Sequence, residues 1–255
     1  MATVMTAATP APPLFRNRTF VSLWLGQAIS VVGDGFHSVA LGIWVLQATG
    51  SASAMAMIMS TRIVVSILLG AIGGTVVDRT DRRLLMIAMH LVRFLTVGAI
   101  ALLVRAGQTS LLPIIALTAL TAVASAFFGP AFQASLVNIV SKEELPKASG
   151  LLQVTNTVGQ IVGPFLGGAI VALFGGWAAL SGDALTFLAA AIAVVIGGAF
   201  PSPRRDGDQQ KSFWKDLAEG FRYVRHHQLA GSVMILAPML NFFGNAIGVL
   251  LPVIA

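Results

Sequence analysis

Long apolar runs alternate with short polar connections along nearly the whole chain. Runs of about 20 residues with little charge predict membrane-crossing helices, because a hydrocarbon core about 30 Å thick needs roughly that length of helix. Inside the fourth run, Gly129–Pro130 predicts a kink or break in the helix. The pattern predicts seven spans, at residues 20–46, 52–77, 84–104, 111–140, 148–174, 177–200 and 229–255.

Composition supports an all-α integral membrane protein. Hydrophobic residues make up 56% of the 255 residues and charged residues only 10%, against roughly 25% charge in soluble domains. The chain has no cysteine, which excludes disulfides and thiolate metal sites. It also lacks a phosphate-binding loop, a zinc-hydrolase motif and a nucleophile elbow. We therefore expect neither an enzyme nor a cofactor-binding or metal-binding protein.

Basic residues predict the orientation of the spans, because Lys and Arg concentrate in cytoplasmic connections. The N-terminal tail, the turn after the second span, the connection after the fourth and the stretch after the sixth carry most of them, while the opposite connections carry Arg105 alone. This places the N-terminus in the cytoplasm and the chain in the cell membrane, and it explains the net charge of +6 without nucleic acid. The residues on the predicted cytoplasmic side are Arg16, Arg18, Arg79, Arg82, Arg83, Lys142, Lys147, Arg204, Arg205, Lys211, Lys215, Arg222 and Arg225.

Four parts follow from this pattern. Residues 1–19 form a cytoplasmic tail, 20–200 a six-helix bundle, 201–228 a cytoplasmic central loop with an amphipathic helix, and 229–255 a seventh span. The six spans divide as three plus three with opposite starting sides. That division permits an inverted repeat, although the residues show no repeated motif.

Charged residues inside the spans are the candidates for function, because a charge in hydrocarbon costs about 2.5–3.5 kcal/mol on insertion scales. Asp34 lies near the middle of the first span, with His37 on the same helical face and Arg62 at similar depth in the second span. Two hypotheses fit: Asp34 carries a proton during a transport cycle, or Asp34 and Arg62 form a structural ion pair. Arg93 is expected to extend toward the cytoplasmic interface, and Asp183 to serve as a local cap or hydrogen-bond partner near the end of the sixth span.

Two short motifs lie at helix ends and helix faces. The turn after the second span reads GGTVVDRTDRR, in which Asp81 is a candidate N-cap for the third span and Asp78 needs a compensating positive charge. In the fifth span, GQIVGPFLGG places glycine at every fourth position, which predicts close helix packing, and its proline predicts a kink. The turn motif comprises Gly74, Asp78, Arg79, Asp81, Arg82 and Arg83, and the fifth-span motif Gly159, Gly163, Pro164, Gly167 and Gly168.

Both motifs resemble signatures of major facilitator superfamily transporters. The resemblance implies a fold of two six-helix halves, of which this chain matches the N-terminal half, with its 3+3 inverted repeats, plus the seventh helix. It also implies that the turn latches the two halves and that the fifth-span motif is of the antiporter type. The stretches LFRNRTFVSLWLGQAISVVGDGFHSVAL, FFGPAFQASLVNIVSKEELPKASGLLQ and FWKDLAEGFRYVRHH resemble a macrolide-efflux and siderophore-export branch. Phe132 and His90 stand where that branch often has arginine and an acidic residue.

The resemblance implies a secondary transporter that exports small amphipathic molecules by alternating access, coupled to protons. A siderophore or lysophospholipid carrier of the same superfamily, and a membrane scaffold or sensor that transports nothing, remain alternatives. The expected partners are a small amphipathic substrate, protons, membrane lipids and a C-terminal six-helix half. Compared with a twelve-helix transporter, the sequence looks truncated after its seventh span.

Overall fold

The computed structural model describes residues 13–108 and 110–198, together with Ser232 and Leu236. The chain divides into two compact units, Met1–Arg204 and Arg205–Ala255, and the helices described below belong to the first. The predicted amphipathic helix in 201–228 lies outside the described residues, as does nearly all of the predicted seventh span.

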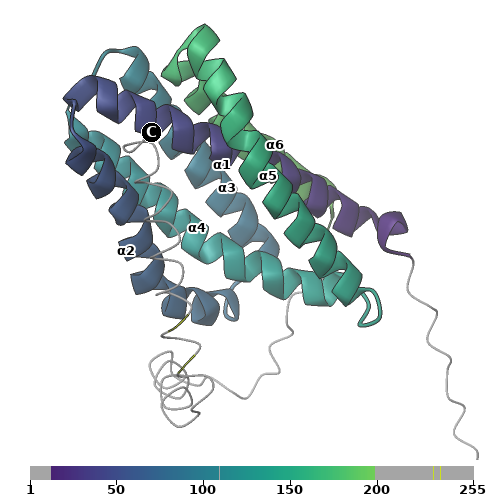
Figure 1. Cartoon of the computed structure of the whole chain (residues 1–255). Coiled ribbons are helices and arrows are strands. Elements are labelled where there is room, and N and C mark those ends of the chain that lie inside the picture. Colours follow the sequence, from purple (N-terminus) through teal and green to yellow (C-terminus); the bar gives the residue numbers. More distant parts are fainter. Residues whose placement is uncertain (1–12, 109, 199–231, 233–235, 237–255) are drawn as a thin grey trace, which may run out of the picture. The chain divides into compact units, whose positions relative to one another are not determined.

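Among its described residues, the first unit has six α-helices that are long and apolar enough to cross a membrane (Figure 1). A short 3-10 helix, Leu14–Arg16, precedes them. The six helices are α1 (Arg18–Thr49), α2 (Ala52–Val77), α3 (Arg82–Arg105), α4 (Leu111–Ile139), α5 (Leu145–Phe174) and α6 (Gly176–Ile196). The all-helical membrane fold is therefore confirmed for the described residues, and each boundary lies within a few residues of the predicted span.

Caps explain several of the boundaries. The side chains of Asn17, Ser51 and Asp81 accept hydrogen bonds from the backbone N–H groups three residues later, at the starts of α1, α2 and α3. Gly50 and Gly175 follow the ends of α1 and α5 with φ of 62° and 85°, a left-handed conformation that glycine adopts without strain. The predicted N-cap at Asp81 is thus confirmed.

The helices α4 and α5 run without a break through Pro130 and Pro164, so the break considered for the fourth span is absent. Pro130 has no N–H to donate to the carbonyl four residues earlier, that of Ala126. Gly73 of α2 packs against this carbonyl: a Cβ at Gly73 would lie 2.7 Å from Ala126 O. The close approach of α2 to α4 therefore depends on glycine at position 73.

Helix pairing repeats between the two halves of the bundle. Helix α1 packs against α5 and α6, and α4 packs in the same way against α2 and α3, while α3 and α6 meet each other. In Figure 1, α5 and α6 lie beside α1, and α2 lies beside α4. Exchanging α1, α2 and α3 with α4, α5 and α6 reproduces the main contacts, as a 3+3 repeat requires.

Three of the fifth-span glycines pack closely against another helix, as their spacing predicts, and this helix is α1. A Cβ at Gly159 would meet the side chain of Val31, and one at Gly163 would lie 2.7 Å from Val32 O and 3.0 Å from Gly35 Cα. A Cβ at Gly167 would lie 2.8 Å from the Cα of Phe36, whereas one at Gly168 would have open space around it. The α1–α5 contact is therefore made by backbone against backbone.

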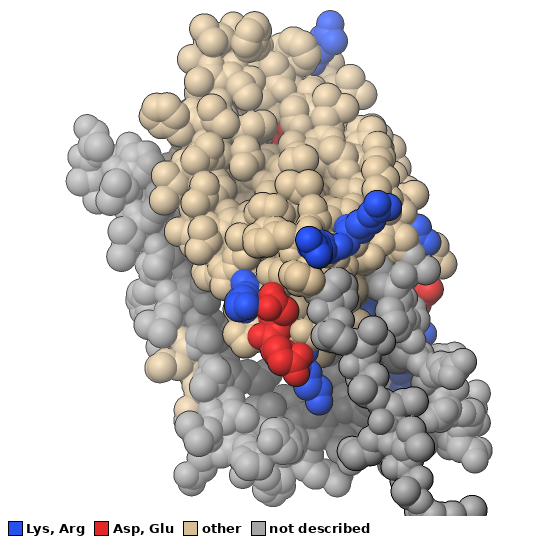
Figure 2. All heavy atoms as spheres, turned by 90° about the vertical axis from the view of Figure 1, so that its right-hand side faces the viewer, with Lys and Arg blue, Asp and Glu red and all other residues tan. Residues whose placement is uncertain are grey.

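Hydrogen bonds to main-chain carbonyls join the helix ends on one side of the bundle, here called the charged end. Asn17 Nδ2 donates to Ile139 O at 2.8 Å, and Thr19 Oγ1 donates to Gly197 O at 2.7 Å. Arg82 Nη1 donates to Ala134 O at 3.0 Å, and Arg83 Nη2 donates to Val195 O at 2.9 Å. The beginnings of α1 and α3 and the last turns of α4 and α6 therefore lie together. Figure 2 shows charged side chains gathered toward one end of the bundle below a broad uncharged surface.

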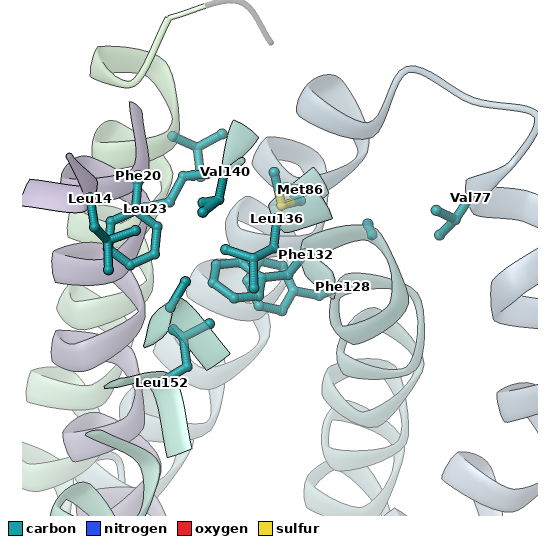
Figure 3. Packing of buried hydrophobic residues seen from close by; sticks show 13 residues of the cluster. Leu14, Phe20, Leu23, Val77, Met86, Phe128, Phe132, Leu136, Val140 and Leu152 are labelled. Atoms are coloured by element: carbon teal, nitrogen blue, oxygen red, sulfur yellow. The ribbon is translucent and has the colours of Figure 1, made fainter. Parts of the chain in front are cut away.

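Apart from a small cluster of Val97, Ala184 and Phe187, two apolar clusters fill the interior of the described bundle. One lies toward the charged end and includes Phe20, Met86, Phe128 and Phe132 (Figure 3). The other lies toward the opposite end and is built from residues such as Leu41, Trp44, Ile58, Ile100 and Leu180. Between them lies the level at which the bundle carries its buried charges.

The glycine contact predicts a position-specific effect on stability. We expect Gly163→Ala to lower the free energy of unfolding by about 1–3 kcal/mol, because the new methyl group forces two backbones apart. Thermal unfolding in detergent, followed by size-exclusion chromatography, measures the effect. Gly168→Ala is the matched control, since its methyl group enters open space. Equal unfolding temperatures for both variants would contradict the packing described for α1 and α5.

Removal of Arg82 should also destabilise the bundle. Its side chain is buried and donates to Ala134 O, so Arg82→Ala removes a charged hydrogen bond between α3 and α4 at a cost of about 1–3 kcal/mol. Arg83 donates its bond in an exposed setting, and Arg83→Ala should have the smaller effect in the same unfolding assay. The reverse order would show that Arg82 does not hold α3 against α4.

Candidate functional site: a layer of buried charge

Helices α1 and α6 bring a histidine and an aspartate together inside the bundle. His37 Nδ1 lies 3.2 Å from Asp183 Oδ2, with 4% and 0% of the two side chains exposed. Gly33, one turn before His37, provides the space: a Cβ there would lie 2.7 Å from Asp183 Oδ1 and would collide with Thr186 Oγ1. A side chain at position 33 is thus incompatible with this pair.

The contacts around this pair are sparse. Thr186 Oγ1 donates to the main-chain carbonyl of Asp183 at 2.7 Å and lies 3.5 Å from Asp183 Oδ1. His37 Nδ1 and Asp183 Oδ2 are close but not aligned as a hydrogen bond, and neither atom has another hydrogen-bond partner. The two side chains therefore lie close together with little hydrogen bonding to the rest of the bundle.

Arg93 of α3 lies between two aromatic rings. Its guanidinium carbon is 4.5 Å from the ring centre of Phe128 and 4.4 Å from that of Phe187, distances at which a cation is attracted to a ring face. Arg93 Nη2 lies 3.0 Å from His90 Nδ1. Because arginine can only donate, His90 accepts through an unprotonated Nδ1. Arg93 is 4% exposed, so the expected extension to the interface is wrong.

Asp34 and Arg62 are half-buried, and their charges act on both Arg93 and Asp183. Within the part of the chain that the structure describes, no ion pair shorter than 4 Å joins Asp34 to Arg62. The direct pair considered from the sequence is therefore absent. Instead, two carboxylates and two guanidinium groups share one level of the bundle.

Asp183 is the residue whose position differs most from expectation. It is the eighth residue of α6, fully buried, and it pairs with another helix instead of capping its own. The aromatic partners of Arg93, Phe128 and Phe187, were also missed. A carboxylate inside a span is a functional candidate by default, and that rule would have selected Asp183. No sequence pattern indicates which aromatic rings enclose Arg93.

The charged turn compensates Asp78 from within the same half. Arg82 Nη2 lies 3.6 Å from Asp78 Oδ1, and the Asp78 side chain is 73% exposed. A Cβ at Gly74 would meet nothing within 4 Å, whereas Gly73 makes the close contact with α4. Of the expected latch residues, Arg82 and Arg83 thus bind α4 and α6, and Asp78 presents an accessible carboxylate.

The described residues show no arrangement for metal chemistry. No three His, Cys, Asp or Glu side chains among them cluster as a metal ion requires. The charge layer consists of Asp34, Arg62, Arg93 and Asp183, with His37 and His90 beside them. Its carboxylates and imidazoles are groups that can bind protons.

Comparison with known proteins agrees with this architecture. Over 92% of its length the chain is 22% identical to macrolide efflux protein A of Streptococcus pyogenes, covering 58% of that protein. It is 25% identical over 82% of its length to the multidrug efflux pump Tap of Mycobacterium tuberculosis, covering 51%. It is 24% identical over 90% of its length to the MFS-type transporter YfiS of Bacillus subtilis, covering 55%. The chain thus spans about half the length of the relatives it matches.

One family matches nearly the whole sequence, over residues 7–255. Its description is transmembrane secretion effector, and it is a family of major facilitator transporters. This agrees with the six apolar helices and the paired arrangement of α1–α3 and α4–α6. The chain therefore belongs to the MFS_3 transmembrane secretion effector family of the major facilitator superfamily.

Proposed function

We propose that this chain is the N-terminal half, with a seventh helix, of a secondary transporter that exports small amphipathic molecules in exchange for protons. The observation that carries the proposal is the layer of charge at Asp34, Arg62, Arg93 and Asp183 inside an otherwise apolar bundle. Such groups are costly in a membrane and mark substrate or proton pathways. Two of the relatives are named as efflux proteins, which supports export as the direction.

Asp34 is the proposed proton carrier of the cycle. It is half-buried, so water or substrate reaches it more easily than the buried Asp183. Loading Asp34 with a proton removes one negative charge from the layer, and the two arginines are then no longer balanced. A change in charge that differs in cost between inward-open and outward-open states shifts their populations. Alternating access coupled to protons requires this property.

The N-terminus and the charged end are proposed to face the cytoplasm. Seven basic side chains of the described region lie at or beside this end, against Arg105 at the opposite one: Arg16, Arg18, Arg79, Arg82, Arg83, Lys142 and Lys147. In this orientation, the exposed Asp78 carboxylate is available to a helix terminus of a C-terminal half. That contact is the proposed latch, and the fifth-span glycines make up the proposed antiporter motif.

Flux measurements with different substrates distinguish the proposed exporter from the alternative carriers and from a protein that transports nothing. Siderophores and lysophospholipids are also amphipathic, so flux of a labelled lysophospholipid or siderophore in the same cells tests those two alternatives. A scaffold or sensor is a different class of protein. It requires that replacing Asp34 or Asp78 leave every measured flux unchanged.

Orientation is testable by cysteine labelling, because the chain has no cysteine of its own. Glu143 and Ser110 are exposed in connections at the two ends of the bundle. We expect a membrane-impermeant maleimide to label Ser110→Cys in intact cells, and Glu143→Cys only after the membrane is permeabilised. Labelling of Glu143→Cys in intact cells would reverse the proposed orientation.

Transport is testable by efflux of a fluorescent amphipathic dye from energised cells. The cells express the complete open reading frame that contains this chain, at membrane levels checked by immunoblotting. We expect lower dye accumulation than with empty vector, full accumulation after a protonophore, and accumulation at the empty-vector level for Asp34→Asn. Glu143→Gln, which removes an exposed carboxylate at the charged end, should transport normally. An Asp34→Asn variant that exports dye at the wild-type rate would contradict the role of Asp34.

A further inference from the structure

We propose that His37 and Asp183 form a second proton-binding site, which lies behind Asp34 and exchanges one proton with it. The inference rests on the proposed function only for its place in a transport cycle, since proton binding by the pair is a property of the resting protein. Asp34 alone has so far been assigned the proton. The pair is the more deeply buried of the two candidates.

The geometry requires a proton between the two side chains. A carboxylate oxygen and an unprotonated imidazole nitrogen are both acceptors, and two acceptors 3.2 Å apart repel each other. Neither His37 Nδ1 nor Asp183 Oδ2 has another hydrogen-bond partner, and both are buried. One of the two atoms therefore carries a proton. We place it on His37 Nδ1, which leaves His37 Nε2 as the atom that gains or loses a further proton.

The charges around the pair allow it to exist with and without that further proton. Away from the helix ends, the other titratable groups of the packed helices are Asp34 on α1, Arg62 on α2, and His90 and Arg93 on α3. The remaining ones lie in first or last turns: Arg18 on α1, Arg82, Arg83 and Arg105 on α3, and Lys147 on α5. Helix α4 has none, and α6 has none besides Asp183. With both histidines neutral, two carboxylates balance two arginines. Uptake of one proton at His37 Nε2 neutralises the pair and leaves one positive charge in excess.

A permanent ion pair would keep one protonation state, whereas the charges around His37 and Asp183 allow two. A buried carboxylate with only a neutral histidine beside it is an uncompensated charge, which the membrane interior disfavours. The charge of Arg62 acts on Asp183, and the charge of Asp183 acts on Arg93, so the form without the extra proton has compensation available. In the form with the extra proton, the imidazolium of His37 compensates the Asp183 carboxylate, and the Asp34 carboxylate then compensates the arginines.

In this proposal, a proton reaches the pair by way of Asp34, on the same helix as His37. Asp34 and His37 lie three residues apart, so they occupy the same face of the helix one turn from each other. Asp34 is half-buried and His37 is buried, so a proton that reaches the Asp34 carboxyl group has one helical turn to cross. The step moves a proton from the Asp34 carboxyl to His37 Nε2, leaving a carboxylate at Asp34 and an imidazolium at His37.

Nitrogen NMR of the imidazole rings tests the proposal directly. The full-length protein is labelled with ¹⁵N-histidine in lipid nanodiscs and studied from about pH 5 to about pH 8, where histidines change charge. The chain contains four histidines, and loss of a signal in His37→Gln assigns His37. We expect His37 to change from a ring protonated at Nδ1 alone to one protonated at both nitrogens. A His37 ring in one protonation state throughout would overturn the proposal.

Matched variants separate this site from Asp34. In Asp34→Asn, His37 should still change protonation state, because its carboxylate partner remains. In Asp183→Asn, the negative charge beside His37 is lost, and the ring should remain neutral over the same range. An unchanged His37 response in Asp183→Asn would overturn the pairing. If Asp183→Asn does not fold, the wild-type and Asp34→Asn spectra decide between the two outcomes.

Transport measurements then distinguish this inference from the proposed function. The dye-efflux rate of His37→Gln should lose the pH dependence of the wild type, whereas Ser181→Ala on α6 should retain it, because the Ser181 hydroxyl donates in an exposed setting to the main-chain carbonyl of Trp177. Proton exchange at His37 without dye export would leave this site standing and refute the transporter. Dye export that depends on Asp34, with His37 fixed in one state, would refute only the second site.

Discussion

The structure depends on the close approach of α1 to two neighbouring helices at once. At Gly163 the backbone of α5 meets Val32 O and Gly35 of α1, and at Gly33 the side chains of α6 occupy the space where a Cβ would be. Van der Waals contact between backbones stabilises helix pairs in a membrane, where no hydrophobic effect separates helix from lipid. The same approach brings Asp183 to His37, so the packing of α1 and the buried pair cannot vary independently.

A second glycine contact repeats this arrangement on the other side of the bundle. Gly73 of α2 meets the Ala126 carbonyl of α4, and Gly163 of α5 meets the Val32 carbonyl of α1; in both cases a Cβ would lie 2.7 Å from the oxygen. The exchange that relates the helix pairs also relates these contacts. An approach of this kind permits weak C–H···O hydrogen bonds from glycine to the carbonyl oxygen. The repeat is therefore visible in the packing, although it is not visible in the residues.

Sequence patterns predicted the positions of residues along each helix better than the direction in which their side chains point. Apolar runs located six helices, because membrane thickness fixes the length of a span. Glycine spacing identified the face of α5 that packs closely against another helix, because residues four apart share a helical face, and the structure shows that this helix is α1. The partners of the buried charges were not predictable in the same way. Asp183 and Asp34 are equally visible in the sequence, but only the arrangement of the helices shows that His37 turns toward Asp183. Likewise, Gly73 and Gly74 differ by one position, and only the rotation of α2 selects Gly73.

Four hydrogen bonds that join different helices at the charged end run from a side chain to a main-chain carbonyl. The donors are on α1 and on the turn and first residues of α3, and the acceptors are the carbonyls of Ala134, Ile139, Val195 and Gly197. Every residue type offers the same carbonyl oxygen. The end of α4 and the end of α6 are thus free to change side chains during evolution without loss of these bonds, and the constraint on sequence falls on Asn17, Thr19, Arg82 and Arg83.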